Sequence, residues 1–155
     1  MSIRPTLLPV LAIAYVAATL PILTGGCGEL AEFISDARTV GVEIVNDTGF
    51  PVDPNIRFDD DAGFLASLFP ADTLDTGLID ADETATYTFD CDELGLIFSD
   101  EAEQVLPLFG DYITDATDIL ERGSDYDCGD VIRFRFVGEG LDFGVIVSVN
   151  GHVVD

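Results

Sequence analysis

The chain has 155 residues, and its 30 acidic side chains against six basic ones give a formal net charge of −24. Such a charge repels nucleic acid and anionic lipid headgroups, which argues against either as a partner held by electrostatic attraction. The length fits one domain of ordinary size behind a short N-terminal segment.

The N-terminal segment differs in kind from the rest of the chain. Arg4 is the only charged side chain before Cys27, and residues 5–23 are uncharged and mostly apolar. A basic start, an apolar run and small residues at the end are typical of an export signal. The run is also about long enough to span a bilayer, so a retained anchor is one alternative, although three prolines disfavour a regular spanning helix. An ordinary cleaved signal that leaves Cys27 as a free thiol is the other.

The signal-like segment ends in Leu23-Thr24-Gly25-Gly26-Cys27. An aliphatic residue followed by small residues and a cysteine resembles the lipobox of bacterial lipoproteins, with the aliphatic residue one position further from the cysteine than is usual. The resemblance implies cleavage before Cys27, lipidation of its sulfur and acylation of the new N-terminus. Several acyl chains together hold a protein firmly on a membrane. We therefore expect a signal peptide over 1–26, a lipidated tether over 27–38, and a cell-envelope protein facing the extracytoplasmic side.

The cysteine count is consistent with this expectation. The chain has three cysteines, Cys27, Cys91 and Cys128, and an odd number in an exported protein calls for an explanation. Lipidation of Cys27 leaves a pair that can form a disulfide in an oxidising compartment. Metal binding by Cys91 and Cys128 is the alternative, but two cysteines without a nearby histidine make a poor zinc site.

From Thr39 onward the pattern indicates short strands. Apolar residues alternate over 40–44, a turn follows at 46–49, and a second strand is expected around 56–58. Asp61 is placed to cap a short helix over 64–69. Threonines alternate with apolar side chains over 84–89, which predicts a half-exposed strand.

The middle of the chain is less clearly patterned. Asp100 and Glu103 have capping-box spacing and predict a short helix that Pro107 stops. Residues 108–123 are expected to be mostly loop, with a strand near Ile119.

The C-terminal part carries the clearest alternation. Apolar residues over 132–136 alternate with Arg133 and Arg135, which we expect to pair with acids on neighbouring strands. A second strand is predicted over 141–149, and Asn150-Gly151 is a strong two-residue hairpin signal before a short last strand. Consecutive hairpins predict antiparallel pairing.

Together these elements predict a mainly β protein, an antiparallel β-sandwich over 39–155 with one or two short helices. Two segments resemble small extracytoplasmic immunoglobulin-like modules. Residues 42–52 resemble their first strand and turn, and residues 79–84 resemble the turn before a later strand. The resemblance implies an immunoglobulin-like fold and says nothing about function.

No motif for catalysis stands out. The only histidine, His152, follows the hairpin turn, and no serine lies in a nucleophile-elbow motif. The domain has no lysine and, with its cysteines paired, no free thiol, which removes Schiff-base and thiol chemistry. Paired carboxylates, as in a glycoside hydrolase, remain open because acids are everywhere. We expect a protein that is not an enzyme and has no catalytic residues.

Calcium is the one cofactor that the composition favours, because hard cations take oxygen ligands and aspartate is abundant. Two segments share Asp-x-Asp-x-Gly spacing, and neither continues as an EF-hand. Turns rich in aspartate also arise from turn chemistry alone. The candidate ligands are Asp59, Asp61, Asp125, Asp127 and Asp130.

These observations predict a non-enzymatic cell-envelope lipoprotein, a structural or protein-interaction module. A calcium-stabilised adhesion-type domain and an envelope hydrolase that uses carboxylates are the alternatives. The expected partners are a membrane, through the lipid anchor, and a protein, but not nucleic acid.

Overall fold

The computed structural model describes residues 38–63, 72–107 and 110–154. The expected signal peptide, Cys27, almost all of the tether and the predicted helix over 64–69 lie outside the described residues. In the part that is described, no helix has the length and apolar character needed to cross a membrane.

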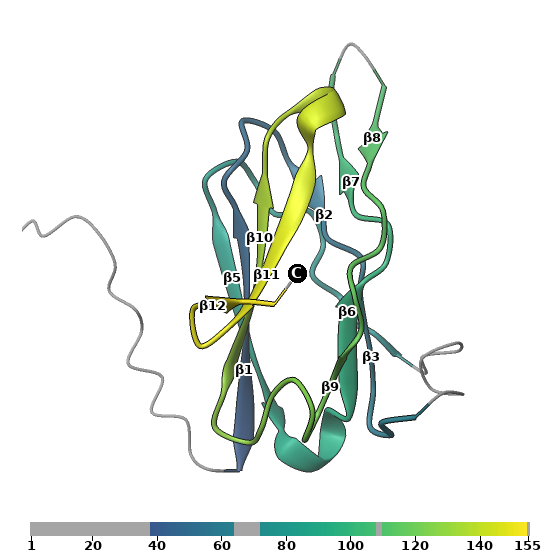
Figure 1. Ribbon diagram of the computed structural model, residues 1–155. Helices are drawn as coiled ribbons and strands as arrows, with labels where there is room; N and C mark the ends of the chain where they lie inside the picture. Colours follow the sequence, from purple (N-terminus) through teal and green to yellow (C-terminus); the bar gives the residue numbers. More distant parts are fainter. Residues whose placement is uncertain (1–37, 64–71, 108–109, 155) are drawn as a thin grey trace, which may run out of the picture. The chain divides into compact units, whose positions relative to one another are not determined.

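The larger sheet has five strands in the order β12-β11-β10-β1-β5 (Figure 1). Its strands are β1 (Thr39–Asn46), β5 (Thr84–Asp90), β10 (Val131–Val137), β11 (Gly144–Val149) and β12 (His152–Val153). Apolar residues at alternate positions of β1 and β10 point to the same side of this sheet, and Val42, Ile44, Ile132 and Phe134 have no exposed surface. Each such side chain contributes roughly 1.5–3 kcal/mol on burial.

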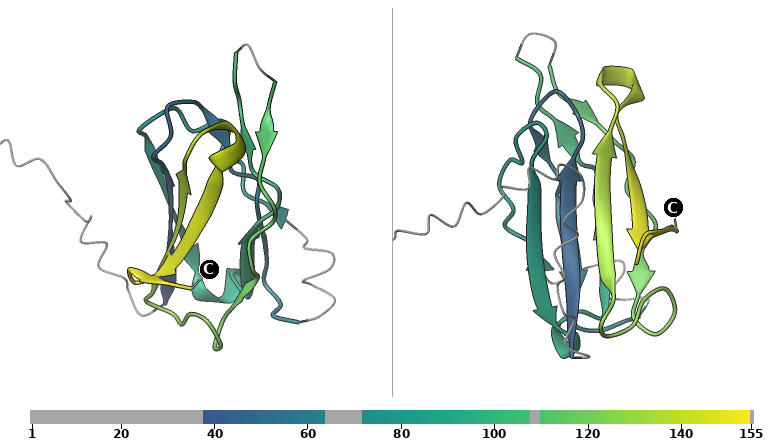
Figure 2. Two further views of the ribbon diagram at one scale, coloured as in Figure 1. Left: turned by 45° about the horizontal axis from the view of Figure 1, so that its top comes forward. Right: turned by 90° about the vertical axis from the view of Figure 1, so that its left-hand side faces the viewer.

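The facing layer consists of two smaller sheets, seen opposite the larger one in Figure 1 and in both views of Figure 2. One has the order β2-β7-β8 and the other β4-β3-β6-β9. Their strands are β2 (Val52–Asp53), β3 (Ile56–Asp59), β4 (Asp72–Thr73), β6 (Leu96–Ser99), β7 (Glu103–Gln104), β8 (Tyr112–Ile113) and β9 (Leu120–Glu121). Two single turns of 3-10 helix, η1 (Cys91–Glu93) and η2 (Gly140–Asp142), complete the described elements. The predicted mainly β sandwich is confirmed.

One strand pair departs from the predicted antiparallel arrangement. β1 and β10 are parallel neighbours, with Glu43 opposite Arg133 and Ile44 opposite Phe134. The other pairs in the larger sheet are antiparallel, as the hairpin signals indicated. A parallel pair needs a long crossover connection, so no local turn signal in the sequence could reveal it.

The predicted helix at Asp100–Glu103 is wrong. Glu101 has a φ of +54°, in the left-handed region, which a right-handed helix does not allow. β7 begins at Glu103, and the N–H of Val105 donates to the carbonyl of Pro51 at 2.9 Å, so the backbone here is used in sheet contacts. Tertiary pairing outweighs the weak local helix signal. The strand expected near Ile119 is present as β9.

The turn predicted at 46–49 is organised by a fully buried asparagine at the end of β1. Asn46 Nδ2 donates to the carbonyls of Phe50 at 2.9 Å, Ile79 at 2.9 Å and Asp80 at 3.1 Å. Its Oδ1 accepts the N–H of Thr48 at 3.0 Å. This one side chain therefore joins the turn after β1 to the segment that leads into β5.

Replacing this asparagine should be costly. Asn46→Ala leaves the buried carbonyl of Ile79 without the amide donor and opens a cavity, so we expect the free energy of unfolding to fall by about 3 kcal/mol in urea titration. Asn46→Asp keeps the acceptor for Thr48 but loses the donor, and it should be at least as unstable. A loss below about 1 kcal/mol for both variants would show that the asparagine does not organise this turn.

Candidate functional site

The predicted disulfide between Cys91 and Cys128 is present, across a sequence separation of 37 residues and with a Cα–Cα distance of 5.7 Å. It lies at the start of β1. The N–H of Cys91 donates to the carbonyl of Arg38 at 2.7 Å, and the N–H of Gly129 donates to the carbonyl of Thr39 at 2.7 Å. The disulfide therefore joins the end of β5 to the segment that enters β10.

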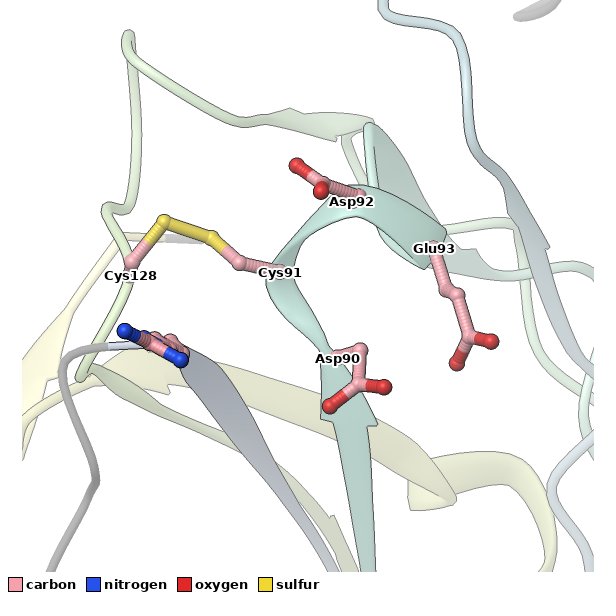
Figure 3. A pocket seen from close by; sticks show the side chains of 6 residues that line it. Asp90, Cys91, Asp92, Glu93 and Cys128 are labelled. Atoms are coloured by element: carbon pink, nitrogen blue, oxygen red, sulfur yellow. A yellow bond between two sulfur atoms is a disulfide. The ribbon is translucent and has the colours of Figure 1, made fainter.

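A surface pocket of about 720 Å³ lies beside this disulfide (Figure 3). It is lined by Arg38, Asp90, Cys91, Asp92, Glu93 and Cys128. Three carboxylates and a single guanidinium leave the pocket with a negative charge. Its sulfur atoms are held in the disulfide, so neither is a thiolate nucleophile.

A second pocket, of about 490 Å³, shares Asp92 and Glu93 with the first. Two aromatic rings, Phe58 from β3 and Phe89 from β5, form part of its wall in an edge-to-face arrangement with centroids 5.0 Å apart. The remaining lining residues are Asp60 and Asp72, so four carboxylates surround the two rings. Aromatic faces and carboxylates together suit a cationic group. Sequence reasoning missed this pocket because its residues come from three separate segments of the chain.

The first half of the predicted calcium set is brought together. Asp59, Asp60 and Asp61 each offer a carboxylate oxygen, and these oxygens lie within 4.8 Å of one another. The Asp59 carboxylate is buried and accepts the N–H of Asp61 at 3.0 Å. A Cβ on Gly95 would overlap the backbone of Asp60 and Asp61, so only glycine lets the two segments pack so closely. Asp60 was not among the predicted ligands.

The other predicted calcium ligands lie in turns, where their carboxylates accept hydrogen bonds. The Asp125 carboxylate accepts the N–H of Glu121 at 2.8 Å, and the Asp130 carboxylate accepts the N–H of Asp127 at 2.7 Å. Asp130 also accepts from the Asn150 side chain at 2.7 Å. Among the described residues, Asp125, Asp127 and Asp130 do not join a group of three acids close enough to share one ion.

The two arginines of β10 pair with acids, as expected. Arg133 Nη2 lies 2.5 Å from Glu43 Oε2 on β1, and Arg135 forms an ion pair with Asp47 just beyond the end of β1. Both arginine side chains are at least a third exposed, so each pair contributes little stability.

A carboxyl pair that sequence reasoning missed lies between β7 and the residue before β8. A side-chain hydrogen bond with Asp111 raises the pKa of Glu103, and desolvation and the negative charges of Asp111 and Asp53 raise it further. A raised folded-state pKa favours folding while Glu103 is protonated, and this contribution is lost as the pH rises through that pKa. Carboxyls in direct hydrogen bond are closer than the roughly 5 Å or more that separates the acids of a glycosidase.

Two further side chains, those of His152 and Tyr126, are of types that can transfer protons. His152, on β12, is exposed. The hydroxyl of Tyr126 donates to the carbonyl of Leu94 at 3.0 Å, and burial raises the pKa of this phenol well above its usual value. Tyr126 therefore stays protonated and connects the loop before β10 to the loop before β6.

No protein-family model, curated protein or solved structure matches this chain.

Proposed function

We propose that this chain is a cell-envelope lipoprotein whose β-sandwich is a non-enzymatic interaction or structural module, held outside the cytoplasm by lipid on Cys27. The observation that carries the proposal is the Cys91–Cys128 disulfide. Disulfides persist in oxidising compartments, so the bond favours an exported domain. It also uses two of the three cysteines and leaves Cys27, at the end of the signal-like segment, as the odd one.

The way in which polar side chains are used supports a module rather than an enzyme. Ser99 donates its hydroxyl to the carbonyl of Pro54 at 2.7 Å, and the Gln104 side chain accepts the N–H of Gly140 at 2.9 Å. Together with Asn46, these buried groups hold loops and strands in place. The acids, by contrast, are concentrated on exposed surfaces and pockets, where they are available to a cationic partner.

Lipid attachment is tested by removing the acceptor sulfur. We expect Cys27→Ser to abolish incorporation of labelled palmitate and to move the protein from the membrane fraction to the soluble fraction, since the acidic domain has no affinity of its own for anionic lipid. Cys128→Ser, which breaks only the disulfide, is the matched control and should remain in the membrane fraction. Membrane retention of unlabelled Cys27→Ser would contradict the proposal.

A calcium-stabilised adhesion-type domain is the second candidate, favoured by the grouping of Asp59, Asp60 and Asp61. An ion that binds only the folded state raises the free energy of unfolding. With a dissociation constant near 1 mM, typical of extracellular modules, 10 mM calcium would add about 1.4 kcal/mol, or roughly 5 °C in Tm.

Thermal melts in calcium, in chelator and in sodium chloride of equal ionic strength decide this point. The paired variant Asp60→Asn with Asp61→Asn should lose the calcium-dependent rise, and the exposed Asp115→Asn should keep it. An equal Tm in calcium and in the salt control would rule out this candidate.

A further inference from the structure

β5 is a long edge strand of the larger sheet, and no other strand in the described part of the chain pairs with its outer side. It has seven residues, whereas the edge strands β12, β2, β8, β4 and β9 have two residues each in the part of the chain that is described. In the right-hand view of Figure 2 it forms the teal border of the sheet beside β1. Proteins usually protect such edges with proline, lysine or a bulge. The segment Thr84–Asp90 has no proline or lysine, and its pairing with β1 runs without a bulge.

The hydrogen bonds at its two ends tell which backbone groups of β5 are free. The N–H of Asn46 donates to the carbonyl of Glu83, and the N–H of Cys91 donates to the carbonyl of Arg38. Hydrogen-bonded and non-bonded pairs alternate along an antiparallel ladder. In this register the N–H and C=O groups of Ala85, Tyr87 and Phe89 therefore bond to β1.

The intervening residues of β5 therefore direct their N–H and C=O groups away from β1. These residues are Thr84, Thr86, Thr88 and Asp90. Among the described residues, no backbone group outside the sheet bonds to any of the four. Their side chains are also exposed, so nothing in the described part of the chain covers this row of donors and acceptors.

The end of this edge lies at the aromatic and acidic pocket. Phe89 points into the sandwich and contacts Phe58 there. A residue placed opposite Phe89 on an added strand would point to the same side of the sheet. It would meet the pocket's four carboxylates, which belong to Asp60, Asp72, Asp92 and Glu93. An arginine fits this position, because its guanidinium bonds to carboxylates and packs on aromatic rings.

We propose that the free edge of β5 binds an extended segment of a partner protein as a sixth strand, with an arginine of that segment beside Phe89. Charge complementarity selects this occupant over a second copy of the chain, since two chains of −24 repel each other. Backbone pairing supplies affinity in such strand addition, and the pocket supplies the preference for a basic side chain. The inference rests on the proposed interaction function and names the chemistry of its partner.

The test uses the full chain in detergent and an eight-residue peptide of alternating threonine and valine with an arginine near each end. Amide hydrogen exchange, followed residue by residue by NMR at about 0.15 M salt, should slow about tenfold or more at Thr86 and Thr88 when the peptide binds. Exchange at Tyr87, which already bonds to β1, should change little. A peptide with glutamate in place of arginine is the control and should give no protection.

Two variants separate backbone pairing from charge attraction. Thr86→Pro removes an outward N–H but no bond to β1, and it should weaken peptide binding by about tenfold in calorimetry. Neutralising three pocket acids should weaken binding by a similar factor; the changes are Asp60→Asn, Asp72→Asn and Glu93→Gln. The matched control neutralises three exposed acids around η2, at the other end of the sandwich in Figure 1, and should bind as the wild type does; its changes are Asp115→Asn, Glu139→Gln and Asp142→Asn.

Each other outcome overturns the inference. Binding without protection at Thr86 and Thr88 would mean attraction by charge alone. Equal loss in the pocket variant and its control would mean that the pocket has no special role. If the chain carries lipid on Cys27 but does not bind the arginine peptide, the proposed partner is wrong and the proposed lipoprotein function is unaffected. Because the exchange measurement needs no substitution, it decides the matter even if Thr86→Pro fails to fold.

Discussion

The disulfide between Cys91 and Cys128 is the constraint on which both the fold and the functional proposal depend. β1 and β10 are parallel neighbours that lie far apart in sequence, so their pairing requires a long crossover and a large loss of chain entropy. The disulfide joins the end of β5 to the entry of β10, with the start of β1 bonded to both cysteine segments. In the chain-entropy model a loop of this length stabilises the fold by about 4 kcal/mol.

The same constraint determines where the acids of the sandwich lie beside aromatic rings. By fixing the end of β5, the disulfide places η1 and its acids beside the two aromatic rings of Phe58 and Phe89. β5 pairs with β1 in a regular register, which leaves one continuous row of backbone groups at the sheet edge. A chain so rich in acids and so poor in bases pairs few of its acids with its own arginines. Arg133 and Arg135 form their ion pairs where β10 lies beside β1, on the side of β1 away from β5. A cationic partner is therefore the natural complement of this end of the molecule.

Much of the larger sheet could be predicted from the sequence, because one face is buried and one is exposed. The alternation over 40–44, 84–89 and 132–136 marks strands that exist, and the arginines interleaved in the last of them do pair with acids. The disulfide was predicted from the cysteine count together with the expected export and lipidation of Cys27. Asn150-Gly151 forms the expected tight hairpin, with both residues at positive φ.

The facing layer was harder to predict for a physical reason. All four residues of β6, Leu96–Ser99, are buried, so this strand has no polar face and no period of two. Five other strands of this layer, β2, β4, β7, β8 and β9, have two residues each. Their existence depends on tertiary pairing, as at β7, where local capping signals pointed to a helix. The aromatic pocket and the pair of Glu103 with Asp111 are likewise products of long-range packing, and no spacing along the chain reveals them.

The most direct test of the account is the intact mass of the native protein, measured before and after reduction. The account predicts a chain that begins at Cys27, carries the mass of a lipid thioether and an acylated N-terminus, and gains two hydrogens on reduction as the Cys91–Cys128 bond opens. A native protein that begins at Met1, carries no lipid and has three free thiols would contradict it.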